Sequence, residues 1–306
     1  MLTLTTSKIV EIFVDCDDFM IEFSKSLQAR GSLIGNTAQP ESDISASEIM
    51  TICILYHHSR MDCFKSFYKL IVLQRLKSFF PDSPSYPHFV KLKKHYLFEL
   101  FAFLLSQRLA RPSGEANFID SKKLQACHLK REKQHKVMEG LAAKGKTSTG
   151  WFFGLKLHLI INEYGEPVRF LVTSGNKADN NEGVLKRLFG GLVGCFYGDK
   201  GYLTKLKAWL KSQGATLITK IKKNMKKPML SHKQKHYLKR RALIETVFGL
   251  LSFQCDIDHT RHRSQHGFFI NLFSGLIAYT YLESLPMLKR FSAREIQEGS
   301  FVLIKD

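Results

Sequence analysis

Acidic residues at two places in the chain follow directly on short apolar runs. Asp120 comes after Phe118-Ile119, and Asp199 comes after the run at 195–197 and one glycine. In α/β sheets, ligands gather beyond the ends of strands, because side chains there project from a rigid edge. Each aspartate, taken singly, is also an ordinary turn former. Together they are candidates for a shared site at one sheet edge.

A third acid, Glu245, lies inside the apolar segment 242–251. The composition predicts a helix that is apolar nearly all round and therefore buried. A buried carboxylate is costly unless it is paired or bound to metal, which makes Glu245 a candidate ligand. The alternative is an i, i+4 ion pair with Arg241, which contributes only about a few tenths of a kcal/mol if it is exposed.

Three carboxylates suit the in-line cleavage of a phosphodiester. Charge develops on the attacking and the leaving oxygen, and two divalent cations roughly 3.5–4 Å apart stabilise it. Carboxylate oxygens select Mg²⁺ or Mn²⁺, whereas histidine and cysteine favour softer metals. Asp120, Asp199 and Glu245 are therefore candidates for the catalytic residues and for the ligands of two Mg²⁺ ions, with Mn²⁺ as a substitute.

The charge balance indicates a polyanionic partner. The 306 residues include 46 Lys and Arg against 27 Asp and Glu, a net charge of +19. A basic body of this size favours DNA, because each neutralised phosphate releases counterions; the alternative is a merely soluble basic protein. Six scattered cysteines without a paired spacing are typical of a reducing cytoplasm. Neither a signal peptide nor a membrane span is expected, so the prediction is a cytoplasmic protein.

Clusters of basic residues indicate where the chain is expected to contact DNA. Segment 205–241 holds thirteen Lys or Arg and no acid, a pattern that favours phosphate contact over a solvated face of mixed charge. Alternation within 155–159 places Lys156 and His158 on one strand face, either near the metals or half-exposed. Trp151 is either a base-stacking residue or a core residue at a strand edge. The predicted DNA contacts are Lys156, His158, Lys200, Lys222, Lys223, Lys226, Lys227, Arg241, Arg261 and Arg263.

The elements that must position these residues change in type along the chain. The first 110 residues are predicted to be helical, with a capping box at Ser45 and Glu48 and a break at the prolines of 81–87. After a linker at 111–114, the pattern predicts strands and helices in α/β order, and 122–149 is expected to be a mobile loop. The strands are expected at 118–119, 153–161, 168–172, 195–197 and 215–221, and the helices at 181–192, 203–212, 240–253 and 267–285.

Four phrases in fixed order give the chain a family resemblance. Residues 117–121, 150–158, 197–202 and 241–248 are similar to the DDE transposases of bacterial insertion sequences, above all to insertion-sequence family 982. The resemblance covers roughly residues 45–285. It implies an α/β fold with a ribonuclease H-like mixed sheet flanked by helices in the catalytic domain, 113–290. An all-helical N-terminal domain, 1–112, would precede it, and a tail, 291–306, would follow.

The same resemblance implies an activity and partners, with the same set of Asp120, Asp199 and Glu245 as the metal ligands. The enzyme would cut the ends of its insertion sequence and join the 3′ hydroxyls to target DNA, so its partners would be double-stranded terminal inverted repeats and target DNA. A homodimer associated with the nucleoid is expected, and the N-terminal domain would recognise DNA ends or dimerise. Related groups carry a tyrosine, arginine, glutamate and lysine signature, but Leu238 and Ser252 stand at the tyrosine and lysine positions. A catalytically inactive DNA-binding protein and a simple metal-dependent nuclease are the alternatives.

Overall fold

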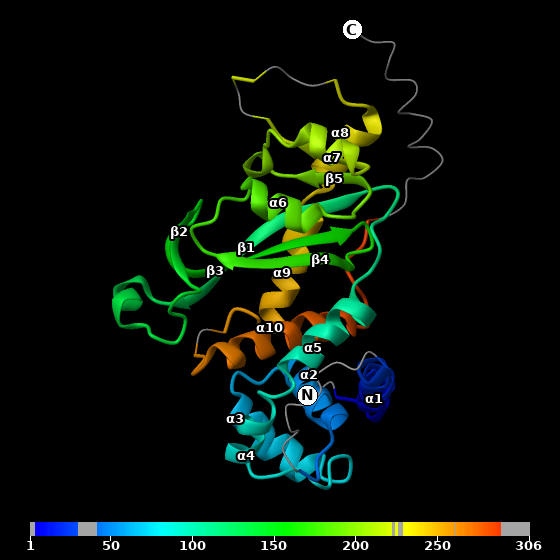
Figure 1. The fold of residues 1–306 in the computed structure, drawn as a ribbon, viewed down its shortest axis with the longest axis vertical. Helices are drawn as coiled ribbons and strands as arrows, with labels where there is room; N and C mark the ends of the chain where they lie inside the picture. The colour runs from blue at the N-terminus through cyan, green and yellow to red at the C-terminus, as the bar shows by residue number, and fades with distance from the viewer. Residues whose placement is uncertain (1–3, 30–41, 222–223, 226–228, 260, 289–306) are drawn as a thin grey trace. The chain divides into compact units, whose positions relative to one another are not determined.

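The computed structural model describes residues 4–29, 42–221, 224–225, 229–259 and 261–288 (Figure 1). The chain divides into two compact units. The first, called here the helical unit, consists of Met1–Leu109, Lys133–Glu139 and Leu250–Leu282. The second, called the sheet unit, consists of Ala110–Glu132, Gly140–Gly249 and Glu283–Asp306. The domain boundaries at 112 and 290 stay a prediction.

The helical unit is built around the apolar helix α2. This helix begins at the predicted capping box, in which the Ser45 hydroxyl accepts from the Glu48 backbone and the Glu48 side chain accepts from the Ser45 backbone. Nearly every residue of α2 is buried, and α1 and α10 both pack against it. The helices of this unit are α1 (Thr6–Ala29), α2 (Ala46–His58), α3 (Phe64–Phe67), η2 (Tyr68–Arg75), α4 (Tyr86–Leu92), α5 (Leu97–Phe103), η3 (Leu104–Arg108) and α10 (Gln265–Thr280).

The sheet unit contains a curled mixed sheet. Its order is β2-β3-β1-β5-β6, and β4 pairs with β3 beside this path. β1 is antiparallel to β3 and parallel to β5, and β5 is parallel to β6. A mixed sheet of this kind, flanked by helices, is compatible with a ribonuclease H-like fold. The strands are β1 (Asn117–Cys127), β2 (Ala143–Thr147), β3 (Gly150–Asn162), β4 (Pro167–Ser174), β5 (Gly194–Gly198) and β6 (Ala215–Thr219).

Helices cover both faces of this sheet. On one face, Ile119 and Ile160 pack with Leu185 and Leu188 of α6 in a buried cluster. On the other face, ring contacts join Phe118 to Tyr197 and Tyr197 to Tyr237 of α8, with centroids 6.0 and 5.6 Å apart. Figure 1 shows α6 in front of the sheet and α9 behind it. The helices of this part are η4 (Leu129–Gln134), α6 (Glu182–Phe189), η5 (Lys200–Tyr202), α7 (Lys207–Ser212), α8 (His232–Arg240) and α9 (Leu243–Phe253).

The prediction of a mobile loop over 122–149 is wrong. β1 continues to Cys127, and 143–147 form β2, so both segments are backbone partners of the long strand β3. These lysine-rich segments lack the alternation of apolar residues that marks a typical strand. They form strands because β3 supplies their backbone hydrogen-bond partners. Separately, no helix in the described parts of the chain is long and apolar enough to cross a membrane.

Candidate functional site

Asp120 and Asp199 lie side by side on neighbouring parallel strands. The register of β1 and β5 pairs Phe118 with Tyr197 and Ile119 with Gly198. Asp120 within β1 and Asp199 directly after β5 therefore occupy the next position along each segment. Because side chains alternate across a strand, both acids continue the face of Phe118 and Tyr197, where α8 packs. Two separate stretches of sequence therefore deliver carboxylates to one sheet edge.

Arg241 joins Asp120 to Glu245. Its Nη1 donates to Asp120 Oδ2 at 3.3 Å, and its Nη2 donates to Glu245 Oε1 at 3.1 Å. Arg241 ends α8, and Glu245 lies one turn later in the first turn of α9. The guanidinium side chain is only 12% exposed, so both ion pairs are shielded on the arginine side. The planar guanidinium group of Arg241 thus binds two carboxylates that lie far apart in sequence.

The pKa of Asp120 shows how crowded this edge is with negative charge. The pKa of Asp120 is raised to about 6, mainly by burial, and the nearby charges of Asp179 and Asp199 contribute to this rise. The hydrogen bond from the Ser121 backbone N–H and the charge of Arg241 lower the same pKa. Ionising Asp120 therefore requires a positive partner, which Arg241 provides here.

The expectation that Glu245 is buried is wrong. Its side chain is 57% exposed, and the i, i+4 pair with Arg241 that the sequence also allowed is present. The helix is amphipathic: Ile244, Val247 and Leu251 are buried on one stripe. The other side of the helix carries Ala242, Thr246 and Gly249, whose small side chains gave the segment its apolar composition all round. Exposure leaves Glu245 accessible to a ligand.

Asp179 is a fourth carboxylate, which the sequence pattern did not single out. Its Oδ1 accepts from Ser121 Oγ at 2.8 Å and from Lys156 Nζ at 3.2 Å. His158 Nδ1 is 3.9 Å away, but burial lowers the pKa of His158 to about 4, so Lys156 is the cation that pairs with Asp179 at neutral pH. The acid sits in the turn 175–181, rich in Asn and Asp, where nothing in the sequence separates it from a turn former.

The Asp179 carboxylate lies on the sheet face opposite to Asp120. Its partner Ser121 follows Asp120 in β1 and therefore points to the α6 side. Asp179 Oδ2 is also near Gly201, since a Cβ built there would be 3.4 Å from it. Burial raises the pKa of Tyr202 far above its ordinary value, and the charges of Asp179, Asp120 and Asp199 add to the shift. Asp179 thus links the end of β1 to the turn that carries Asp199.

The predicted DNA contacts fall into five groups. Lys156 and His158 are buried, with Asp179 as a neighbour of both. Lys200 is exposed directly after Asp199. Arg261 and Arg263 are exposed in the helical unit. Arg241 lies among the acids, and Lys222, Lys223, Lys226 and Lys227 lie outside the described residues.

The donor chemistry fits a hard divalent cation, although a ready-made cluster is absent. Among the described residues, no group of three or more His, Cys, Asp or Glu side chains is arranged to hold a metal ion. Asp120, within β1, and Asp199, directly after β5, nevertheless lie on neighbouring parallel segments, and Arg241 pairs with both Asp120 and Glu245. These oxygen donors are the type that Mg²⁺ and Mn²⁺ prefer.

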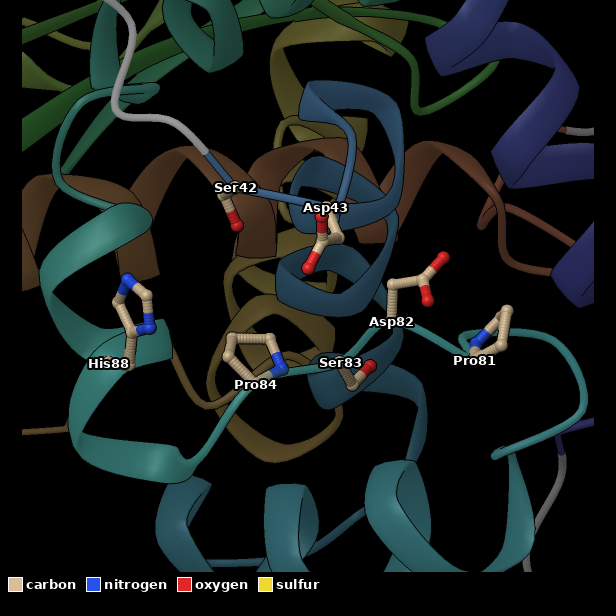
Figure 2. A pocket seen from close by; sticks show the side chains of 7 residues that line it. All are labelled: Ser42, Asp43, Pro81, Asp82, Ser83, Pro84 and His88. Atoms are coloured by element: carbon tan, nitrogen blue, oxygen red, sulfur yellow. The ribbon is translucent and has the colours of Figure 1, made fainter.

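A separate cavity of about 440 Å³ lies in the helical unit. Figure 2 shows its lining: Ser42 and Asp43 ahead of α2, the segment 81–84, and His88 of α4. None of the carboxylates described above takes part. The candidate site described above therefore lies apart from this cavity, in the sheet unit.

The comparisons with known proteins agree with this geometry. A family model described as a transposase DDE domain matches residues 111–265, half of the chain. The chain belongs to this family. The match begins just before β1 and includes all four acids and Arg241, so the DDE transposase region contains the whole strand edge. Comparison with curated proteins finds no match.

Proposed function

We propose that this DDE transposase cuts the ends of a mobile DNA element and joins the freed 3′ hydroxyls to target DNA. Asp120, Asp199 and Glu245 are the proposed catalytic residues, and a ribonuclease H-like catalytic domain is the proposed scaffold. The observation that carries the proposal is the position of Asp120 and Asp199, each one residue beyond the last paired residues of the parallel strands β1 and β5, with Glu245 joined to Asp120 through Arg241.

Each of these residues has a distinct task in the proposed site. Asp120 presents its oxygens from within β1, and Asp199 presents its oxygens from the residue after β5, so the paired strands support both acids. Glu245 is exposed on α9, so its side chain has room to turn towards the other acids. Arg241 offsets their charge. Two Mg²⁺ ions, or Mn²⁺, held by the three carboxylates would supply the positive charge that stabilises the attacking and leaving oxygens.

The proposal extends to partners and origin. The four sequence phrases support a bacterial insertion-sequence enzyme of family 982 that acts on terminal inverted repeats and target DNA as a homodimer at the nucleoid. Lys200, Arg241, Arg261, Arg263 and the lysines at 222, 223, 226 and 227 are the proposed DNA contacts. Lys156 and His158 are left out of this set, because their side chains are buried.

The direct test uses purified protein, Mg²⁺ and linear DNA that carries the element ends with their flanks. Asp120→Ala, Asp199→Ala and Glu245→Ala should each lower the rate of cleavage by about a thousandfold or more, because a lost ligand removes several kcal/mol of charge stabilisation in the transition state. Affinity for the same DNA, measured by anisotropy, should change little, since binding depends mainly on basic residues.

Glu182→Ala is the matched control, because Glu182 is an exposed acid of α6, the helix on the other sheet face. This variant should cut DNA at the wild-type rate. Wild-type rates in any of the three site variants would remove that residue from the catalytic set. Cleavage without joining of 3′ ends to a target duplex would instead identify a simple nuclease.

A further inference from the structure

The tip of the β2–β3 hairpin carries an exposed tryptophan between lysines. Trp151 is 55% exposed, although a core position at the strand edge was the other interpretation of its sequence. Lys146 lies directly opposite it in the register, and Lys144 lies two residues along β2 on the same face. Their Nζ atoms are 5.4 and 5.5 Å from the centre of the indole ring.

The hairpin fixes Trp151 in this outward position. Phe152, the next residue, is buried on the opposite face, where its ring packs against Gly145 and Gly175. Alternation along β3 then forces Trp151 outward. At the tip, Lys123 Nζ of β1 donates to Thr149 Oγ1 at 3.0 Å, which ties the turn to the sheet. The indole is therefore presented on a rigid support.

We propose that Trp151, with Lys144 and Lys146, forms a stacking platform for an unpaired base of DNA. An exposed indole stacks on any base whose face is free, and neighbouring lysines attract the phosphates of the same strand. A base inside a duplex has no free face, so the platform selects single-stranded or unpaired nucleotides. Lys144 also forms a long pair with Glu132 at 3.9 Å, but both lysines are exposed.

The platform lies on the same sheet face as the catalytic acids. Trp151 and Leu159 are an even number of positions apart in β3, so their side chains lie on the same face. Leu159 is the register partner of Asp120. At ~3.3 Å per residue, the platform is at most about 26 Å along the strand from Asp120. DNA rises ~3.4 Å per nucleotide, which places the platform up to about eight nucleotides from the proposed cut. In this respect the inference rests on the proposed function.

The test measures binding of a short oligothymidylate and of a duplex of equal length, without divalent metal. The chain has two tryptophans, so Trp209→Phe leaves Trp151 as the sole indole. Its fluorescence should be quenched when the oligothymidylate binds. Trp151→Ala should weaken binding of the oligothymidylate roughly 5- to 150-fold, the range that removal of one stacked base gives, and should change duplex affinity less than twofold.

Controls separate stacking from charge, folding and catalysis. Lys144→Gln with Lys146→Gln should weaken oligothymidylate binding more than Lys186→Gln with Arg187→Gln, a matched pair of exposed basic residues on α6. Trp151→Phe should recover most of the affinity that Trp151→Ala loses. Asp120→Ala should keep the quenching, so the platform is tested even if the proposed cleavage is absent.

Two results would overturn the proposal. One is unchanged fluorescence of the Trp209→Phe variant at saturating oligothymidylate, with the melting temperature of wild type. The other is a change from dimer to monomer in Trp151→Ala, measured by light scattering, with oligothymidylate affinity intact. That second result would make the exposed indole an interface between two copies of the chain.

Discussion

At the scale of single residues, replacing Asp179 tests whether DNA cleavage depends on an acid that is not one of the proposed metal ligands. Asp179→Asn keeps an acceptor for Ser121 but removes the charge opposite the buried Lys156. We expect DNA cleavage to fall roughly 10- to 100-fold, the usual effect of losing a partner that orients ligands. DNA affinity should stay unchanged. Single-turnover cleavage rates and anisotropy measure the two quantities.

A second variant distinguishes positioning from plain stability. Asp179→Asn leaves Lys156 as a buried unpaired charge, so the melting temperature should also fall. Adding Lys156→Met removes that charge and should restore the melting temperature but not the cleavage rate. If the double variant recovers cleavage as well, Asp179 only neutralises Lys156 and does not align the strand ends.

The sequence could reveal some site residues and not others. The proximity of Asp120 and Asp199 was predictable, because each acid follows an apolar run and the two runs pair as parallel strands. Their catalytic role stays a prediction. Asp179 was not predictable, because an Asn- and Asp-rich turn has the same composition with or without a function. The position of Tyr237 also depends on packing: its hydroxyl donates to Glu115 ahead of β1, and its ring contacts Tyr197.

At the scale of elements, segment 205–241 is the strongest candidate for binding the phosphates of DNA. Changing Lys222, Lys223, Lys226 and Lys227 to Glu should weaken binding to all duplex sequences alike. The plot of log affinity against log salt should become shallower by about 0.9 for each duplex phosphate that the variant no longer neutralises. Fluorescence anisotropy at a series of salt concentrations gives this slope.

The matched control for this segment lies on α6. Lys186 and Arg187 are exposed there, on the helix that covers the sheet face away from Asp120. Changing both to Glu alters the charge as much as changing Lys222 and Lys223 does, but should leave the slope as it is. If both pairs changed the salt slope equally, and both variants melted at the wild-type temperature, DNA binding would depend on the overall charge of the protein and not on this segment.

Elements were predictable where local pattern and tertiary structure agree. α2 with its capping box, α6 and the parallel strands β5 and β6 all follow from apolar periodicity with clear end signals. β2 and the second half of β1 did not, since their pairing with β3 depends on partners remote in sequence. α8 was hidden within a basic run, although Ser231 and Gln234 form a capping box at its start.

At the scale of the whole molecule, the excess of positive charge has a consequence for how the site is assembled. Basic residues over most of the chain draw in DNA, while the strand edge concentrates negative charge around Asp120. A phosphate is repelled from such an edge unless cations neutralise it. On the proposed mechanism, we expect divalent metal to bind the carboxylates before DNA is cut. Within the described residues, Arg241 is the only cation ion-paired to Asp120 and Glu245.

The central claim is that segments around Asp120, Asp199 and Glu245 form one metal site. Fe²⁺ in place of Mg²⁺, with ascorbate and peroxide, produces hydroxyl radicals that cut the backbone close to the bound metal. Mass spectrometry of the fragments should then show cuts near all three residues, suppressed by excess Mg²⁺ and abolished together in Asp120→Ala. Cuts confined to one of the three segments, or cuts that excess Mg²⁺ does not suppress, would contradict a shared metal site.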